Sequence, residues 1–425
     1  MANKLTIMQT VEGMLKLTEQ GKPSTLIGIG PMSSNLLQAT FELARDLDFP
    51  PMFIASRNQV DLDELGGGYV NGWDQFRFSA DIKAAADAVG YTGDYYLCRD
   101  HGGPWQRDGE RNAHIPEEEA MELARKSYKA DLEAGFDLLM IDPTKDPFEI
   151  GKVIPLDVVL RRTVDLIQWC EDKRKELGLA PIGYEVGTEE TNGGLTTTDK
   201  YQVFIEQLKV ELGERGLPMP TFIVGQTGTL VRLTEQVGTY DFDNAIALGK
   251  MAASYGVGLK EHNCDYLDDI TMLIHAPAGV TASNVAPQFG TEETRALLRL
   301  AELEGRLAEK GLVAEPSRLR DVLLERAILT ERWRKWMVGE DTKLTVEQIF
   351  ADPEKALVIL DIAGHYTFNE EPVKAEVAKN AANLAACHID AQRYAVDCIK
   401  RSIRQFVEGY NLEGLGARLR EVLGA

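Results

Sequence analysis

The chain of 425 residues lacks a long apolar run, because no stretch of about 18 or more apolar residues occurs in it. We therefore expect no membrane span. The opening stretch, MANKLTIMQTVEGMLKLTEQG, carries acidic side chains and no cleavable apolar core, which argues against a secretory signal. Together these absences predict a cytoplasmic protein.

Cysteine pairs and an excess of basic residues are also missing. The five cysteines are scattered and form no Cys-x-x-Cys pair, which argues against a cysteine-rich zinc module and predicts reduced thiols. The 46 basic and 67 acidic residues give a net charge of −21, so we expect neither a nucleic acid nor an anionic membrane as partner. A local positive site for a phosphorylated small molecule is still compatible with this charge.

Short β-branched or aromatic runs alternate with amphipathic stretches of helical period over the first 290 residues. The eight runs are TLIGIG (25–30), PMFIAS (51–56), DYYLCR (94–99), DLLMID (137–142), PIGYEV (181–186), TFIVGQ (221–226), GLKEHN (258–263) and TMLIHA (271–276). Eight such units predict a (β/α)8 TIM barrel. The weakest unit joins the last two runs, since its crossover has room for about one helical turn.

An open doubly wound sheet is the alternative fold. Its dinucleotide-binding form needs a glycine-rich first turn, but GIGPMSSN has no third glycine and no strong ribose-binding acid follows it. The strand-like runs cease near Gly290, and the rest of the chain is charged and amphipathic. We therefore expect a barrel over residues 1–290 and a C-terminal helical extension over 291–425 that packs on the barrel or on a partner.

Three of the six histidines fall at the ends of predicted barrel strands. His101 follows the third run, His262 the seventh and His275 the eighth. The active site of a TIM barrel lies at this end of the strands. Three imidazoles around an open position are typical of a catalytic Zn²⁺ site, with Mn²⁺ or another divalent ion as alternatives. A single histidine at a strand end is more often structural, but three together favour a metal site.

Carboxylates at the same end are candidates for acid–base chemistry. Asp100 precedes His101 and could act as a general acid or base, or merely cap the turn at the following glycines. Glu189, in GYEVGTEETNGG, could act likewise or be a solvated loop acid. Other polar residues at strand ends are candidates for substrate binding: Asn58, Gln59, Asp142, Gln226 and Asp265.

Several short motifs resemble one known family, the accessory (Z) subunits of tagatose-bisphosphate aldolases. They occur in the family's order between Gly28 and Leu298: SRNQV with GGGYVNGW, then RDHGGPWQ, VGTEE, VGQTGT and EHNCDYL. The first strand departs from the family pattern, because GPMSSN stands where a Cys-Ser-Ala-His-Pro element is usual. The chain also has a longer tail.

The resemblance implies a (β/α)8 barrel and a role in ketose or ketose-phosphate metabolism. Family members were named as non-catalytic stabilisers of a class II aldolase, and related proteins are metal-dependent ketose 4-epimerases. Class II aldolases are more distantly similar. They use an Asp-His pair and two later histidines as acid and zinc site, a plan that Asp100, His101, His262 and His275 match.

These observations lead to a specific hypothesis and two alternatives. We expect a metal-dependent enzyme that breaks and remakes the C3–C4 bond of a ketose, by C4 epimerisation or aldol cleavage. A non-catalytic stabilising subunit of a class II tagatose-bisphosphate aldolase is the first alternative. A cofactor-independent isomerase is the second, but it leaves the three histidines unexplained. A homo-oligomer or a partner aldolase subunit is expected to accompany the chain.

A phosphate site is suggested by GVTASNVAPQFGTEETR, where a helix opens after the last strand and Arg295 lies nearby. Glu292 and Glu293 stand in the same turn and would repel phosphate. This pattern favours an unphosphorylated or singly phosphorylated sugar.

Overall fold

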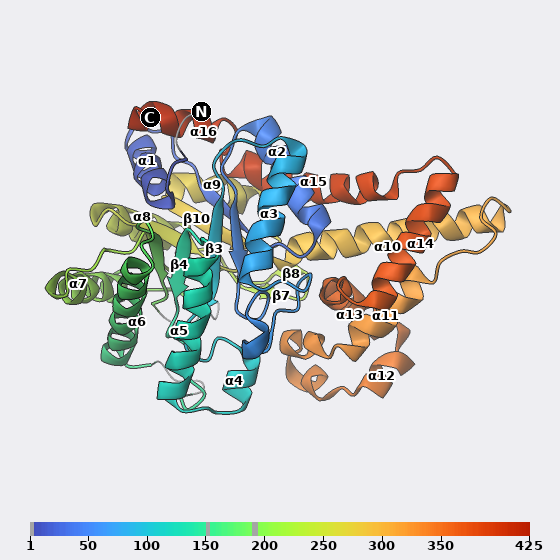
Figure 1. The fold of residues 1–425 in the computed structure, drawn as a ribbon, viewed down its shortest axis with the longest axis horizontal. Coiled ribbons are helices and arrows are strands. Elements are labelled where there is room, and N and C mark those ends of the chain that lie inside the picture. Colours follow the sequence, from blue (N-terminus) through green and yellow to red (C-terminus); the bar gives the residue numbers. More distant parts are fainter. Residues whose placement is uncertain (1–3, 150–153, 189–193) are drawn as a thin grey trace.

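Parallel strands close a barrel, which occupies the left part of the molecule in Figure 1. The structure is a computed structural model that describes residues 4–149, 154–188 and 194–425. The barrel order is β1-β10-β9-β6-β5-β4-β3-β2. The strands are β1 Leu26–Ile29, β2 Met52–Ala55, β3 Tyr96–Gly102, β4 Leu138–Ile141, β5 Gly183–Val186, β6 Phe222–Val224, β9 Gly258–Glu261 and β10 Val280–Val285. This closed barrel confirms the predicted fold and excludes the doubly wound alternative.

Helices form the outer layer because each crossover buries an apolar stripe on the strands. They are α2 Ser34–Leu47, α3 Gln75–Val89, α4 Asp108–Asn112, α5 Glu117–Glu133, α6 Leu156–Glu176, α7 Thr198–Glu214, α8 Phe242–Ser254 and α9 Asp269–Ala278. A short 3-10 helix, η1 Asp63–Leu65, follows β2, and a hairpin of β7 Val231–Arg232 and β8 Glu235–Gln236 follows β6. Both lie in loops after strands, at the catalytic end of a barrel of this kind.

The predicted eighth strand is wrong, because the run 271–276 forms part of helix α9. Asp268 caps this helix by accepting a hydrogen bond from the backbone of Thr271, and Gly279 ends it with φ +85°. The true eighth strand is β10, and α9 is the crossover that leads to it. A short run of mainly apolar residues fits a helix as well as a strand, so periodicity alone could not separate the two.

The C-terminal residues build a helical lobe that projects from one side of the barrel (Figure 1). Helix α10, Pro287–Glu309, starts as the last barrel helix and continues into the lobe. The other elements of the C-terminal part are α11 Leu319–Leu329, η2 Arg332–Trp336, η3 Gly339–Lys343, α12 Val346–Ala351, α13 Pro353–Ala363, η4 Gly364–Thr367, α14 Glu371–Ala386, α15 Ala391–Gly409 and α16 Leu415–Leu423. The lobe has its own core, which includes Trp333, Ile359 and Leu384.

The last two helices return to the barrel. Helix α15 packs on α2 and α10, and its Phe406 and Tyr410 belong to the barrel core. Helix α16 packs on α1, Ile7–Glu19, which covers the end of the barrel where both termini lie (Figure 1). We propose a barrel and a helical extension as the two structural units. The boundary at residue 290 falls inside α10, so the two are joined by a continuous helix.

None of the helices in the described ranges is both long enough and apolar enough to span a membrane.

Candidate active site

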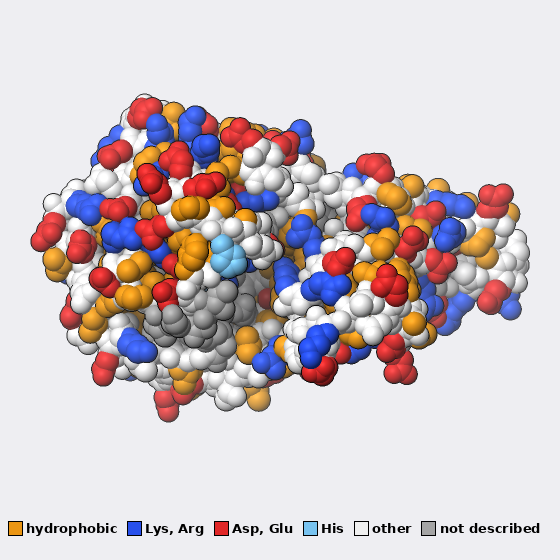
Figure 2. Space-filling model, turned by 90° about the horizontal axis from the view of Figure 1, so that it is seen from below, with side chains coloured by type: hydrophobic (Ala, Val, Ile, Leu, Met, Phe, Trp, Pro, Cys, Tyr) orange, Lys and Arg blue, Asp and Glu red, His pale blue; other side chains and the backbone are white. Residues whose placement is uncertain are grey.

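A cavity of about 570 Å³ opens at the carboxyl end of the barrel strands. Figure 2 views the molecule from this side, where lysine and arginine side chains gather along the groove between barrel and lobe. Asp100 and His101 lie on the barrel side of the cavity, and Lys335, Trp336 and His365 lie on the lobe side. The volume is in the usual range of roughly 300–1,000 Å³ for small-molecule sites.

The end of β3 is irregular, and this irregularity allows two consecutive side chains to serve one site. In a regular strand Asp100 and His101 would point to opposite faces. The pairing of β3 with β4 shifts register between Arg99 and Gly102, and His101 has a left-handed φ of +43°. The bulge turns both side chains toward the cavity, which both line.

Asp142, directly after β4, fixes the ring of His101. His101 Nδ1 lies 2.7 Å from Asp142 Oδ2. Burial alone would raise the pKa of Asp142, but hydrogen bonds from His101 and Thr144 lower it to about 2. The carboxylate is therefore ionised, Nδ1 carries the hydrogen, and Nε2 is the nitrogen that faces the site.

Glu185, on β5, holds the second imidazole in the same way. His262 Nε2 lies 2.7 Å from Glu185 Oε1, and the other carboxylate oxygen forms an ion pair with Lys260. Burial opposes ionisation of Glu185, but Lys260 and His262 hold its pKa below the usual value. His262 thus donates from Nε2 and presents Nδ1 to the site.

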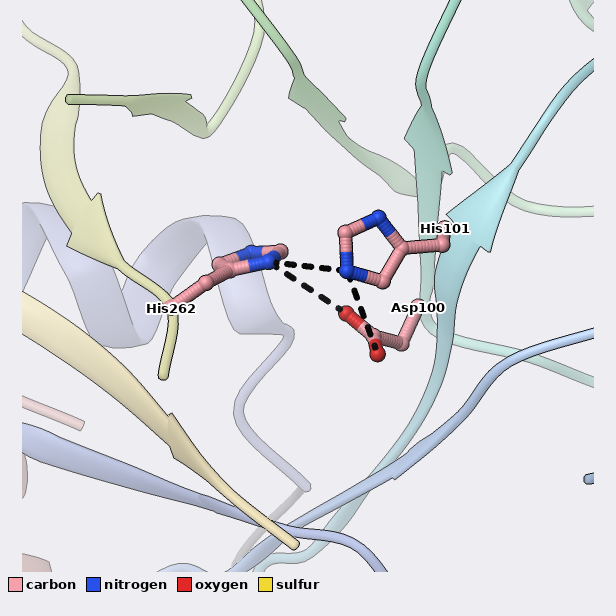
Figure 3. A group of neighbouring side chains, drawn as sticks. All are labelled: Asp100, His101 and His262. Atoms are coloured by element: carbon pink, nitrogen blue, oxygen red, sulfur yellow. Dashed lines mark hydrogen bonds and ion pairs between the residues drawn. The ribbon is translucent and has the colours of Figure 1, made fainter. Parts of the chain in front are cut away.

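The two remaining ring nitrogens face each other. His262 Nδ1 lies 3.2 Å from His101 Nε2 (Figure 3). Two neutral rings held in these tautomers would direct their lone pairs at one another, so the arrangement calls for a cation between them. Burial alone would lower the pKa of His101, but the carboxylates of Asp100 and Asp142 raise it to about 9, so a proton meets this need in the absence of a metal ion.

The same geometry fits a divalent metal ion. Two imidazole nitrogens bound to Zn²⁺ at about 2.0–2.1 Å lie roughly 3.3 Å apart when the angle is tetrahedral. Asp100 brings carboxylate oxygens to 4.0 Å from His101 Nε2 and 3.9 Å from His262 Nδ1. Carboxylates behind metal-binding imidazoles, as Asp142 and Glu185 are here, are a usual feature of zinc sites.

His275 does not join this group, which corrects the predicted set of three histidines. It belongs to α9, and its Nε2 lies 2.8 Å from Glu261 Oε2. Side chains alternate along β9, so His262 points into the barrel and Glu261 points outward to the helices. His275 is fully buried there between the rings of Tyr240 and Tyr410.

Glu261, Cys264 and His275 form a second cluster with metal-type ligand atoms. All three are fully buried, and Cys264 Sγ lies 3.7 Å from Glu261 Oε2. The cluster lies in the wall between β9 and the helices and does not border the cavity.

The predicted substrate-binding residues divide into two groups. Asn58 and Gln59 line the cavity. Gln226 and Asp265, although buried, are not among the described residues that line it, and Asp142 acts through His101. The predicted base Glu189 lies outside the described residues.

Asp265 occupies the helix end that was expected to bind phosphate. Its Oδ1 accepts hydrogen bonds of 2.9 Å from the backbone N–H groups of Ala286 and Gln288, at the start of α10. Burial raises the pKa of Asp265 to about 7, although these N–H groups act in the opposite direction. Arg295 is paired with Asp361. Neither these backbone N–H groups nor the Arg295 guanidinium is therefore available to an external anion.

Sequence reasoning missed three residues of the site. Lys260 and Glu185 are buried in the barrel interior and pair with each other, and Asn284 on β10 donates a 2.9 Å hydrogen bond to Asp100 Oδ1. The spacing of Lys260 two residues before His262 is the signal that could have placed both on the inner face. Asn284 was missed because the eighth strand was misplaced.

The family model described as D-tagatose-1,6-bisphosphate aldolase subunit GatZ/KbaZ-like matches residues 11–393. The chain belongs to this family. The match confirms the resemblance drawn from the motifs and extends it into the helical lobe. No curated protein sequence matches this GatZ/KbaZ-like chain.

Solved structures share the fold of this GatZ/KbaZ-like chain at low identity. A probable tagatose 6 phosphate kinase from Sinorhizobium meliloti 1021 is 19% identical with a TM-score of 0.73, covering 91% of this chain and 100% of its own. The fructuronate-tagaturonate epimerase UxaE from Cohnella laeviribosi is 13% identical with a TM-score of 0.57, covering 92% and 82%. A fructose-bisphosphate aldolase from Campylobacter jejuni is 12% identical with a TM-score of 0.51, covering 97% and 96%.

Proposed function

We propose that this chain is a metal-dependent enzyme of ketose or ketose-phosphate metabolism that breaks and remakes the C3–C4 bond. The observation that carries the proposal is the pair of imidazole nitrogens, 3.2 Å apart, next to the carboxylate of Asp100, where Asp100 and His101 line a cavity of sugar size. The family description and the structural neighbours, which include an epimerase and an aldolase, point to the same class of substrate.

His101 and His262 would hold the ion, with Zn²⁺ as the first candidate and Mn²⁺ or another divalent ion as alternatives. When bound, such an ion polarises a carbonyl oxygen of the substrate as a Lewis acid. Asp142 and Glu185 keep the two rings in the tautomers that this requires. Lys260 forms an ion pair with Glu185, and this positive charge keeps the carboxylate ionised although it is fully buried.

Asp100 is the proposed acid–base group. Its carboxylate would accept the proton of the C4 hydroxyl while the C3–C4 bond breaks, so that C4 becomes an aldehyde and the bonding pair moves toward C2. Asn284 orients Asp100 through its 2.9 Å hydrogen bond. Departure of the aldehyde and addition of a proton at C3 of the remaining enediolate give aldol cleavage. Rotation of the aldehyde, renewed C3–C4 bond formation and return of the proton from Asp100 to the C4 oxygen give the C4 epimer. Asn58 and Gln59 are proposed to bind hydroxyl groups.

The test is an assay of metal-loaded protein with D-tagatose, D-fructose and their phosphates, followed by chromatography of the products. Asp100→Asn should lower kcat by about 10²–10⁴-fold, the usual contribution of a positioned acid or base, with unchanged metal content. Asp87→Asn, at an exposed ion pair with Lys83, is the matched control and should keep full activity. Equal activity of Asp100→Asn and wild type, or no C4 chemistry on any of these sugars, would refute the proposal.

A stabilising subunit of a class II aldolase is the second candidate. The family is described as an aldolase subunit, and the lobe exposes the apolar side chains of Phe350, Leu357 and Val358. These side chains favour a contact, either in a homo-oligomer or with a partner aldolase subunit. Light scattering of the chain alone and of the chain mixed with a class II aldolase distinguishes a homo-oligomer from a mixed complex. A stable mixed complex, formed by a chain with no activity of its own, would favour the subunit role.

A further inference from the structure

The helical lobe contributes one wall of the cavity that contains Asp100 and His101. Lys335 and Trp336 come from η2, and His365 and Tyr366 come from η4. On the barrel side, Tyr69 packs edge-to-face on Tyr366 with the ring centroids 4.9 Å apart. The packing joins the loop after β2 to the lobe, so this wall is part of the folded molecule.

His365 is a buried polar side chain that lacks a hydrogen-bond partner among the described residues. It is 3% exposed and borders the cavity, yet neither ring nitrogen forms a hydrogen bond within the described part of the chain. Burial, with Lys335 and Arg332 nearby, lowers the pKa of His365 to about 3, so the ring is neutral. Buried polar atoms are rarely left unsatisfied, so an unpartnered ring at the edge of a cavity indicates a ligand.

Positive charge lines the same cavity from the lobe and from the β7–β8 hairpin. Lys335 Nζ lies 5.2 Å from the ring centroids of both Trp336 and Tyr366, and Arg232 on β7 also lines the cavity. Neither cation forms an ion pair with a carboxylate in residues 4–149, 154–188 or 194–425. Both side chains are exposed, so their charges reach the solvent at the mouth of the cavity.

Carboxylates of the cavity do not neutralise these cations. Asp108 is paired with Arg111, and Asp100 accepts its hydrogen bond from Asn284. The helix end that could otherwise bind an anion is capped by Asp265. Lys335 and Arg232 are thus available to a negative charge on the ligand.

We infer that the lobe and the β7–β8 hairpin form a subsite for the anionic end of the sugar, with Lys335 and Arg232 supplying charge and His365 a hydrogen bond. This inference rests on the proposed function, because it assumes that the other end of the same open-chain sugar contacts Asp100 and His101. The anion is a phosphate ester or a sugar carboxylate, two groups with the same negative oxygens.

The experiment measures binding by calorimetry for D-fructose 6-phosphate, D-fructuronate and D-fructose. Lys335→Met should weaken binding of the anionic sugar about tenfold or more and leave that of D-fructose unchanged, because it removes a charge-assisted contact. His365→Gln should weaken the anionic sugar by a smaller factor. Lys343→Met is the matched control, since this exposed lobe lysine is already paired with Glu340 at 3.0 Å. The anionic sugar that binds more tightly shows whether the subsite prefers a phosphate ester or a carboxylate.

Two outcomes would overturn the inference: Lys335→Met binding the anionic sugars as wild type does, or wild type binding neither of them. The metal content of the same preparations distinguishes failure of the subsite from failure of the proposed function. Lys335-dependent binding by a protein that takes up no metal ion would refute the proposed function and leave the subsite intact. A metal-loaded, active protein that is indifferent to Lys335→Met would refute the subsite alone.

Discussion

His262 Nδ1 and His101 Nε2 lie 3.2 Å apart, and the opposite nitrogen of each ring is hydrogen-bonded to a buried carboxylate. The two carboxylates determine which nitrogen of each ring is free, so the pairing is a property of the fold rather than of the two rings alone. The proposed chemistry depends on this relationship.

Removing a carboxylate behind a ligand should weaken metal binding without removing a ligand. In Asp142→Asn, the side-chain amide can either accept a hydrogen bond from His101 Nδ1 or donate one to it. His101 is then no longer held in one tautomer. We expect metal affinity to fall about 10–100-fold, the usual effect of such a change. Competition with a chelating dye measures it. Asp146→Asn, close in sequence but paired with Arg162, is the control, and an equal loss in both variants would contradict the argument.

The ion pair between Arg99 and Asp131 should be essential for stability. Both side chains are fully buried, with Arg99 Nη2 2.6 Å from Asp131 Oδ1. Arg99→Met leaves the carboxylate buried without a partner, which costs about 3–5 kcal/mol of unfolding free energy. Lys83→Met, at an exposed ion pair, should leave the unfolding free energy close to that of wild type.

Urea unfolding of both variants against wild type measures these changes. The double variant Arg99→Met with Asp131→Leu should recover part of the loss, because no unpaired charge then remains. If Arg99→Met were as stable as Lys83→Met, the ion pair between Arg99 and Asp131 would contribute nothing to stability.

Glu42 should make the packing of α15 on the barrel sensitive to acid. Burial alone would raise its pKa, but hydrogen bonds from Arg393, Lys400 and Gln38 lower it to about 2. The folded chain then binds fewer protons here than the unfolded chain, whose glutamate titrates near 4.5. The stabilisation is complete above pH 4.5 and is lost as the pH falls toward 2.

Urea midpoints of wild type and Glu42→Gln between pH 6 and pH 3 check this. The difference between the two should be largest at pH 6 and should narrow with acidification. Glu12→Gln, at an exposed pair with Lys16, should show little difference at any pH. A difference for Glu42→Gln that grows as the pH falls would contradict the sign of the pKa change.

Much of the barrel could be predicted because buried parallel strands appear as short apolar runs. Seven of the eight runs are strands, and the exception, 271–276, is an apolar helix turn. The true strand, VTASNV, contains three polar residues, Thr281, Ser283 and Asn284, and therefore did not look like a strand. The misplaced strand also explains why His275 was assigned to the site and Asn284 was not.

Asp100, His101 and His262 were correctly placed together because strand ends converge in a barrel. The pairing of Lys260 with Glu185 could not be predicted, since their strands are not consecutive in sequence and a buried ion pair leaves no periodic pattern. The contribution of His365 was equally hidden. It depends on a lobe folding back over the barrel mouth, which is a matter of tertiary packing.

The most direct test is the metal content of purified wild type, His262→Asn and His275→Asn, each titrated with Zn²⁺. The account predicts about one ion per chain in wild type and in His275→Asn, and loss of the ion in His262→Asn, because Zn²⁺ binds at the facing imidazoles. Loss in His275→Asn with retention in His262→Asn would place the ion in the buried cluster with Glu261 and Cys264. That result, or a wild-type protein that takes up no ion, would contradict the proposed active site.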